Sequence, residues 1–137
     1  MKIQLRRKND AVLMEASNEN GNTIVLDGSA EVGGVEGGFR PMQTLLAGLG
    51  GCSAIDVVDI LKKQRQPLED LEVEINAERE DKPAPSVFTA IDVHFKFKGK
   101  LNEAKVQKAV ELSIDKYCSV ARMLEKTAII TYQITIN

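Results

Sequence analysis

The chain has 137 residues, with 18 Lys and Arg against 20 Asp and Glu, and a formal net charge of -2. These charges are scattered along the sequence, which argues against a nucleic-acid-binding surface. A chain of this length can bury a core without disulfides, and its two cysteines fit a reducing compartment better than a secreted disulfide scaffold.

The length also predicts a single domain over residues 1–137. The N-terminus is basic but has no apolar segment of the kind that signal peptides carry. The longest apolar stretch, residues 45–60, contains Asp56 and Asp59 and is shorter than a bilayer requires. We therefore expect a soluble, cytoplasmic protein with no membrane partner.

The first 27 residues alternate between apolar and polar side chains in three short runs, with turn signals at Asn9-Asp10 and at residues 18–21. This pattern predicts a three-stranded antiparallel meander. The glycine-rich residues 28–40 then predict a loop, and Pro41 suits the first turn of a helix because its missing N–H would be unpaired there.

From Pro41 to about Gln64, apolar residues occupy every face of the expected helix. Such a helix needs neighbours all round, so we expect a homodimer in which the central helices of the two copies pack together. Three glycines, Gly48, Gly50 and Gly51, each cost the helix about 1 kcal/mol relative to Ala. They indicate either close approach of another element or room for a substrate beside Cys52.

The second half of the chain predicts two strands, a helix and a last strand. Residues 71–77 and 87–97 alternate as a hairpin with one wet side, and a second helix is expected from the cap Asn102 to Tyr117. A short helical turn at 119–124 and a strand at 127–136 follow. The order βββ-α-ββ-α-β predicts an α+β fold.

Several kinds of chemistry find no support in the sequence. The glycine-rich segment lacks the features of a phosphate-binding loop or a dinucleotide fingerprint. His94 is the sole histidine and lies on the polar face of its strand, so it predicts an ordinary exposed residue. Ser53 has no nucleophile-elbow context. We expect no metal and no cofactor.

The two cysteines carry the remaining chemistry. A thiolate can attack the O–O bond of a peroxide to give a sulfenic acid, and a second thiol can condense with it to a disulfide. Cys52 and Cys118 would supply both thiols. A cysteine in an apolar helix is also typical of an inert small hydrophobe. From the residues alone both interpretations stand.

The runs Pro41-Met-Gln-Thr-Leu-Leu-Ala-Gly-Leu-Gly-Gly-Cys-Ser-Ala-Ile-Asp-Val-Val and Lys116-Tyr-Cys-Ser-Val-Ala-Arg-Met-Leu resemble the paired signatures of the OsmC/Ohr superfamily. The resemblance implies that Cys52 is the peroxidatic thiol and Cys118 the resolving thiol. It also implies an intertwined homodimer, with antiparallel sheets wrapped around two long central helices and active sites at the interface.

Two features depart from the peroxidase branches of that superfamily. Met42 stands where those branches have a glutamate that orients an arginine beside the attacking cysteine. We assign the arginine to Arg7, with Arg6 and Arg40 as alternatives. Asp56 lies four residues after Cys52 on the same helix face, as a polar member of the site or as the partner of a cation across the dimer.

The resemblance predicts a thiol-dependent peroxidase that reduces organic hydroperoxides and is recycled by a dithiol reductant. We expect the substrate pocket to be lined by Met42, Gln43, Leu46, Leu49 and Met123. The alternative is a non-enzymatic dimer that binds a small apolar or electrophilic ligand at the interface, with the cysteines as lining or as a slow redox sensor.

Overall fold

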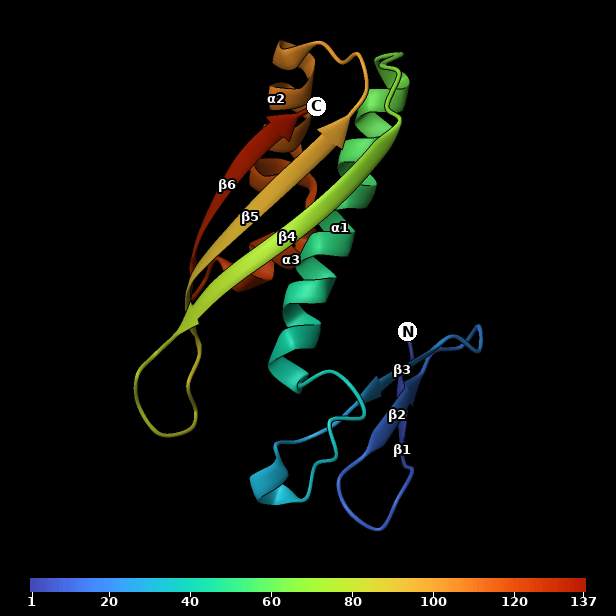
Figure 1. Ribbon diagram of the computed structural model, residues 1–137, viewed down its shortest axis with the longest axis vertical. Helices are drawn as coiled ribbons and strands as arrows, with labels where there is room; N and C mark the ends of the chain where they lie inside the picture. The colour runs from blue at the N-terminus through green and yellow to red at the C-terminus, as the bar shows by residue number, and fades with distance from the viewer. The chain divides into compact units, whose positions relative to one another are not determined.

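The computed structural model describes residues 1–137 and divides into two compact units, Met1–Leu46 and Ala47–Asn137. That the two units form one domain stays a prediction. Three strands precede the first long helix, and two strands, further helical segments and a last strand follow it (Figure 1). The molecule is therefore α+β in the predicted order.

The first unit contains an antiparallel sheet with strand order β1-β2-β3. Its strands are β1 (Gln4–Arg7), β2 (Met14–Ser17) and β3 (Thr23–Leu26). Asparagine side chains hold both turns: Asn9 Oδ1 accepts hydrogen bonds from the Ala11 and Leu13 amides, and Asn18 Oδ1 accepts from Asn20 and Asn22. The predicted meander is confirmed.

Asp27 organises the glycine-rich loop that follows β3. Its buried carboxylate accepts hydrogen bonds from the Gly37, Val35 and Gly28 amides, and the bonds from Gly37 and Val35 lower the pKa of Asp27 the most. A Cβ at Gly34 would lie 1.8 Å from the Gly28 carbonyl oxygen, so only glycine fits. The loop contains a short 3₁₀ turn, η1 (Ala30–Val32).

Helix α1 spans Pro41–Lys63, as predicted. The Gln43 side chain accepts a hydrogen bond of 2.9 Å from the Arg40 amide, which caps the helix start, while the Arg40 guanidinium donates to the Gly28 carbonyl. At the other end Arg65 adopts a left-handed conformation, and the Gln66 amide donates to the Leu61 carbonyl. Both ends of α1 are therefore closed by specific hydrogen bonds.

The second unit holds a sheet with strand order β4-β5-β6. Strand β4 (Asp70–Arg79) pairs antiparallel with β5 (Phe88–Lys98), and β5 pairs parallel with β6 (Ile129–Ile136). The prediction of antiparallel sheets thus holds for the first sheet and for β4–β5 but not for β6. The long helical connection from β5 returns the chain to the end at which β5 began, so β6 runs in the same direction.

The connection from β5 to β6 is helical in three pieces. Helix α2 (Glu103–Leu112) begins at Asn102, whose side chain accepts a hydrogen bond from the Lys105 amide, as predicted. A π-helical turn, η2 (Ser113–Tyr117), replaces the expected end of this helix, and α3 (Ser119–Leu124) follows Cys118. The π-helical turn changes the course of the chain immediately before the second cysteine.

The core of the second unit lies between one face of the sheet and the helices α1 and α2, which cover that face (Figure 1). Fully buried side chains come from all of these elements, namely Leu49, Val57 and Leu61 from α1, Val93, Phe95 and Phe97 from β5, and Val106 and Val110 from α2. Gly50 allows α1 to approach β4, since a Cβ there would lie 3.0 Å from Ile75 Cδ1.

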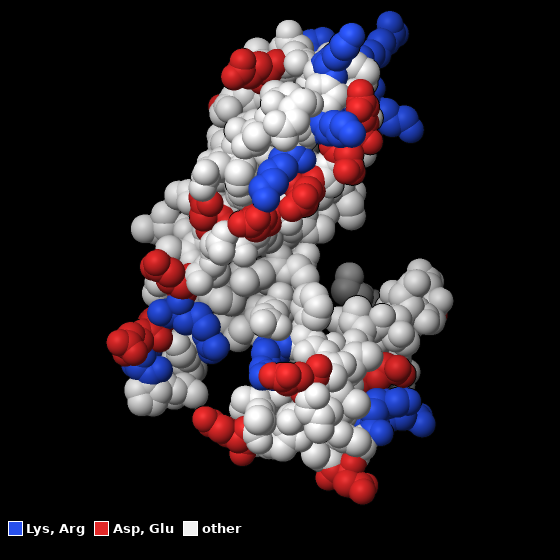
Figure 2. All heavy atoms as spheres, in the orientation of Figure 1, with Lys and Arg blue, Asp and Glu red and all other residues white.

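The opposite face of this sheet is polar. Lys96 pairs with Glu72 and Glu74, and His94 contacts Thr135 Oγ1 at 2.7 Å. Figure 2 shows basic and acidic side chains intermixed on the face it presents, with no broad region of one sign. The predicted wet side of the hairpin is confirmed.

A second face of α1 is exposed within the single chain. Ile55 and Val58 are exposed there, Ile55 to 72%. A Cβ at Gly51 would meet no atom within 4 Å. By length and composition alone, α1 could also cross a membrane, a property that core helices of soluble proteins share. Helix α1 is thus longer than the apolar stretch at residues 45–60, which by itself is shorter than a bilayer requires.

Candidate active site

Cys52, Asp56 and Cys118 come together in the second unit. The two sulfur atoms and a carboxylate oxygen of Asp56 all lie within 4.8 Å of one another. Both cysteines are free thiols; Cys118 is buried and Cys52 is partly exposed. The structure thus brings together two thiols that are separated by 65 residues in the sequence.

Local structure explains this arrangement. Cys52 and Asp56 are four residues apart on α1, so their side chains lie on one face of the helix. The π-helical turn η2 closes with a 2.8 Å hydrogen bond from the Cys118 amide to the Ser113 carbonyl. Cys118 then takes an extended conformation as the residue that precedes α3. Helix α1 and this turn therefore supply one thiol each.

Ser113 links the two elements. Its buried hydroxyl lies 3.1 Å from Asp56 Oδ2 and 3.2 Å from the Ser53 carbonyl oxygen, so it can donate to either. This contact holds the Asp56 carboxylate beside the cysteines. Sequence reasoning did not identify Ser113; the available signal was one hydroxyl between Leu112 and Ile114 in an apolar run.

The two thiols differ in environment. Burial raises the pKa of the Cys118 thiol to about 11, and the neighbouring Cys52 thiol adds to this increase. The Ala121 amide, which donates to Cys118 Sγ at 3.4 Å, opposes it. Cys118 is therefore protonated at neutral pH in the reduced protein.

A cavity of about 520 Å³ opens beside this cluster, with Asp56 in its wall. Its other lining residues are Asp59, Ile60, Lys63, Leu112 and Tyr117. Lys63 pairs with Asp59 at 2.6 Å, so these two charges offset each other at the rim. The cavity gives small molecules in solution a route to the carboxylate.

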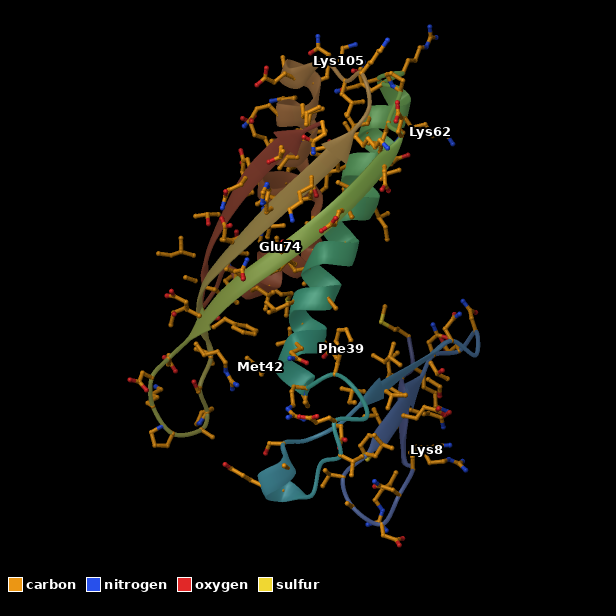
Figure 3. The ribbon with its side chains drawn as sticks, in the orientation of Figure 1. Lys8, Phe39, Met42, Lys62, Glu74 and Lys105 are labelled. Carbon is orange, nitrogen blue, oxygen red and sulfur yellow. The ribbon has the colours of Figure 1, made fainter.

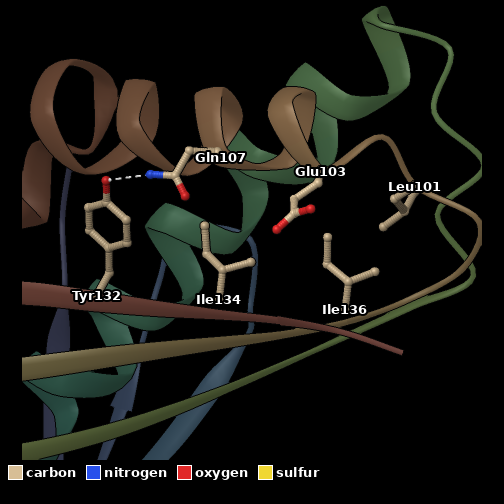
Figure 4. A pocket seen from close by; sticks show the side chains of 6 residues that line it. All are labelled: Leu101, Glu103, Gln107, Tyr132, Ile134 and Ile136. Carbon is tan, nitrogen blue, oxygen red and sulfur yellow. Dashed lines mark hydrogen bonds between the residues drawn. The ribbon is translucent and has the colours of Figure 1, made fainter.

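A separate cavity of about 540 Å³ lies between α2 and β6. Figure 4 shows Glu103 and Gln107 facing Tyr132, Ile134 and Ile136, with the Gln107 amide donating to the Tyr132 hydroxyl at 3.2 Å. No cysteine lines either cavity, but Asp56, which lies within 4.8 Å of both sulfur atoms, lines the first one. The first cavity is therefore the one beside the thiols.

The other predicted site residues have different surroundings. Leu49 is fully buried in the core, whereas Met123 is exposed to 75%. Met42 lies at the N-terminal end of α1 (Figure 3), and the side-chain oxygen of Gln43 accepts the hydrogen bond from the Arg40 amide that caps the helix. Met42, Gln43, Leu46 and Arg7 belong to the first unit. The roles assigned to these residues stay predictions.

The OsmC-like protein family matches residues 33–133 of the chain, a range that includes both cysteines. The chain belongs to this family. Protein YhfA of Escherichia coli K12 is 46% identical over 114 residues, covering 82% of this chain and 81% of YhfA. The predicted family membership is confirmed.

Solved structures show the same fold. A hypothetical protein from Aquifex aeolicus superposes with a TM-score of 0.85 at 29% identity, covering 99% of this chain and 95% of that one. An organic hydroperoxide resistance protein OsmC from Legionella pneumophila gives a TM-score of 0.72 at 16% identity, covering 98% and 95%. The Legionella protein is described as a predicted redox protein.

Proposed function

We propose that this protein is a thiol-dependent peroxidase that reduces organic hydroperoxides through Cys52 and Cys118. The observation that carries the proposal is the pair of free thiols within 4.8 Å of each other, one partly exposed and one buried. The fold shared with the Legionella hydroperoxide resistance protein supports the same chemistry.

The environment of the thiols supports an order of reaction. A thiolate is the attacking species, and the buried Cys118, with its pKa raised to about 11, is poorly suited to attack first. Cys52 is partly exposed on α1 and accessible to a small molecule. Cys52 is therefore the attacking residue and Cys118 the resolving one.

The reaction has two steps that balance. The Cys52 thiolate attacks the terminal oxygen of ROOH, the O–O bond breaks, and the alkoxide takes a proton to leave as ROH, so that Cys52 becomes a sulfenic acid. The Cys118 sulfur then attacks the Cys52 sulfur, its proton and the sulfenic hydroxyl leave as water, and a disulfide forms. A dithiol then reduces the disulfide and is itself oxidised.

Asp56 serves the second step. Cys118 must lose its proton as it attacks, and the Asp56 carboxylate lies within 4.8 Å of its sulfur. The Ser113 hydroxyl holds that carboxylate in place. Asp56 thus accepts the proton from Cys118 and passes it to the departing hydroxide.

The remaining parts of the proposal follow the family resemblance. The protein acts as a cytoplasmic homodimer, Arg7 stabilises the attacking thiolate, and Met42, Gln43, Leu46, Leu49 and Met123 contact the alkyl group of the substrate. Met42 in place of a glutamate favours a second candidate, ligand binding without turnover, in which the same pocket holds a small apolar molecule.

Chemical trapping tests the proposal. Cys118→Ser, treated with cumene hydroperoxide and then dimedone, should carry one dimedone adduct on Cys52, while wild type should carry a Cys52–Cys118 disulfide in peptide mass spectra. Cys52→Ser should form neither product. Unmodified cysteines in wild type after excess peroxide would contradict the peroxidase function and favour ligand binding without turnover.

A further inference from the structure

We propose that the reduced Cys52–Asp56–Cys118 cluster is also a binding site for a thiophilic divalent cation such as Zn²⁺, and that forming the disulfide abolishes it. The inference goes beyond the peroxidase function and does not depend on it, because it concerns the reduced protein. It revises the expectation from the sequence that the protein binds no metal.

The donor set suits such an ion. Zn²⁺ binds thiolate sulfur at about 2.3 Å and carboxylate oxygen at about 2.0–2.2 Å in tetrahedral geometry. Those bond lengths place neighbouring ligand atoms about 3.5–3.8 Å apart. The two sulfurs and the carboxylate oxygen already lie within 4.8 Å of one another. Small side-chain adjustments therefore suffice to close three ligands around one ion.

A hydrogen bond from Ser113 holds the carboxylate ligand, Asp56, in position. The Ser113 hydroxyl, fully buried, lies 3.1 Å from Asp56 Oδ2. Hydrogen bonds of this kind to a ligating carboxylate hold it in position and tune the metal. Cys52 and Asp56 share one helix face, so two of the three ligands are set by α1 itself.

The site would keep a fourth position for water. Asp56 lines the cavity of about 520 Å³, and Cys52 is partly exposed, so an ion can enter from solution. The other carboxylate in that cavity, Asp59, is paired with Lys63 at 2.6 Å. Asp56 is therefore the carboxylate available to the ion, and Asp59 provides a matched control.

Metal binding and disulfide formation exclude each other because both use the same two sulfurs. Binding releases the two thiol protons as M²⁺ enters. An organic hydroperoxide reverses it: the bound dithiolate, ROOH and two protons give the disulfide, ROH, water and free M²⁺. The sulfurs are oxidised, the peroxide oxygens are reduced, and the ion keeps its charge. The metal-bound dithiolate and the disulfide are thus alternative states of the same two sulfurs.

Anaerobic titration of the reduced protein with Co²⁺, followed by displacement with Zn²⁺, tests this inference. We expect one ion per chain and a thiolate-to-cobalt charge-transfer absorption that Zn²⁺ removes. Asp56→Asn should bind at least about 10-fold more weakly, and Ser113→Ala about 10-fold to 100-fold more weakly. Asp59→Asn should bind as wild type does.

Protein whose thiols have been alkylated with iodoacetamide should show no binding, whether or not the chain reduces peroxides. Equal affinity in the alkylated protein, or in a Cys52→Ser, Cys118→Ser double variant, would overturn the inference. So would binding in wild type that is unaffected by Asp56→Asn, since the carboxylate would then not be a ligand. A negative peroxide test with intact metal binding would reject the peroxidase function alone.

Discussion

At the scale of single residues, the chemistry depends on the difference between two thiols that lie close together. Cys118 is buried at the junction of η2 and α3, while Cys52 is partly exposed on α1. Burial favours the neutral thiol in Cys118. In the proposed peroxidase reaction each thiol therefore suits a different step, and Asp56 is the proposed proton acceptor of the resolving step.

Replacing Asp56 by Asn should separate the two steps. We expect Cys52 to be oxidised at close to the wild-type rate, while disulfide formation slows by at least about 10-fold because a positioned acid or base typically contributes 10² to 10⁴. Quenched-flow samples alkylated and analysed by mass spectrometry would count sulfenic acid and disulfide over time. Asp59→Asn, three residues further along α1, should match wild type.

The cysteines were predictable as a pair because they are the only two and each lies in a recognisable motif. Asp56 was predictable from its spacing to Cys52 along a helix. Ser113 was not, because a hydroxyl inside an apolar helical pattern carries no sign of its partner. The contact of Ser113 with Asp56 depends on the π-helical turn η2, which the periodicity of the sequence does not predict.

At the scale of elements, hydrogen bonds to Asp27 hold the loop that leads into α1. The amides of Gly37, Val35 and Gly28 donate to its carboxylate, and the pKa of Asp27 is lowered as a result. Because the folded chain binds this proton less tightly than the unfolded chain does, ionised Asp27 stabilises the loop above the ordinary Asp range. That stabilisation is lost as the pH falls through the lowered pKa.

We therefore expect Asp27→Asn to reduce the protection of the Val35 and Gly37 amides against hydrogen exchange at neutral pH. In wild type the same protection should persist down to about pH 4, the ordinary Asp range, and disappear below it. Protection factors measured by NMR would report both effects. Asp10→Asn, at an exposed position, should change neither amide, and equal loss in both variants would contradict this role for Asp27.

The elements themselves were largely predictable. Strand alternation, the capping Asn102 and the Pro41 helix start all correspond to observed boundaries or contacts. The parallel pairing of β6 was not predicted, since alternation in a strand does not reveal its direction. The direction follows from the helical connection that precedes it.

At the scale of the whole molecule, we expect the exposed apolar face of α1 to be covered by a second copy of the chain. Ile55 is exposed to 72% and Val58 to 42% in the single chain, and a Cβ at Gly51, one turn before Ile55 on the same face, would meet no atom within 4 Å. A contiguous apolar strip on a helix is typical of an interface. The homodimer expected from the sequence would bury it.

Ile55→Asp should therefore shift the protein from two chains to one in light scattering coupled to size-exclusion chromatography. Because Ile55 is mostly exposed in the single chain, we expect the free energy of unfolding of the single chain to change by only about 0.5 kcal/mol. Lys105→Asp, which places the same carboxylate on α2, should leave the mass at two chains. A monomeric wild type would contradict the dimer.

The measurement that tests the central claim most directly is a count of free thiols after reduced protein meets cumene hydroperoxide or hydrogen peroxide in stopped flow. We predict rapid loss of two thiols per chain, faster with the organic peroxide, and no loss in Cys52→Ser within the same time. Thiols that persist through excess organic peroxide in wild type would contradict the peroxidase function.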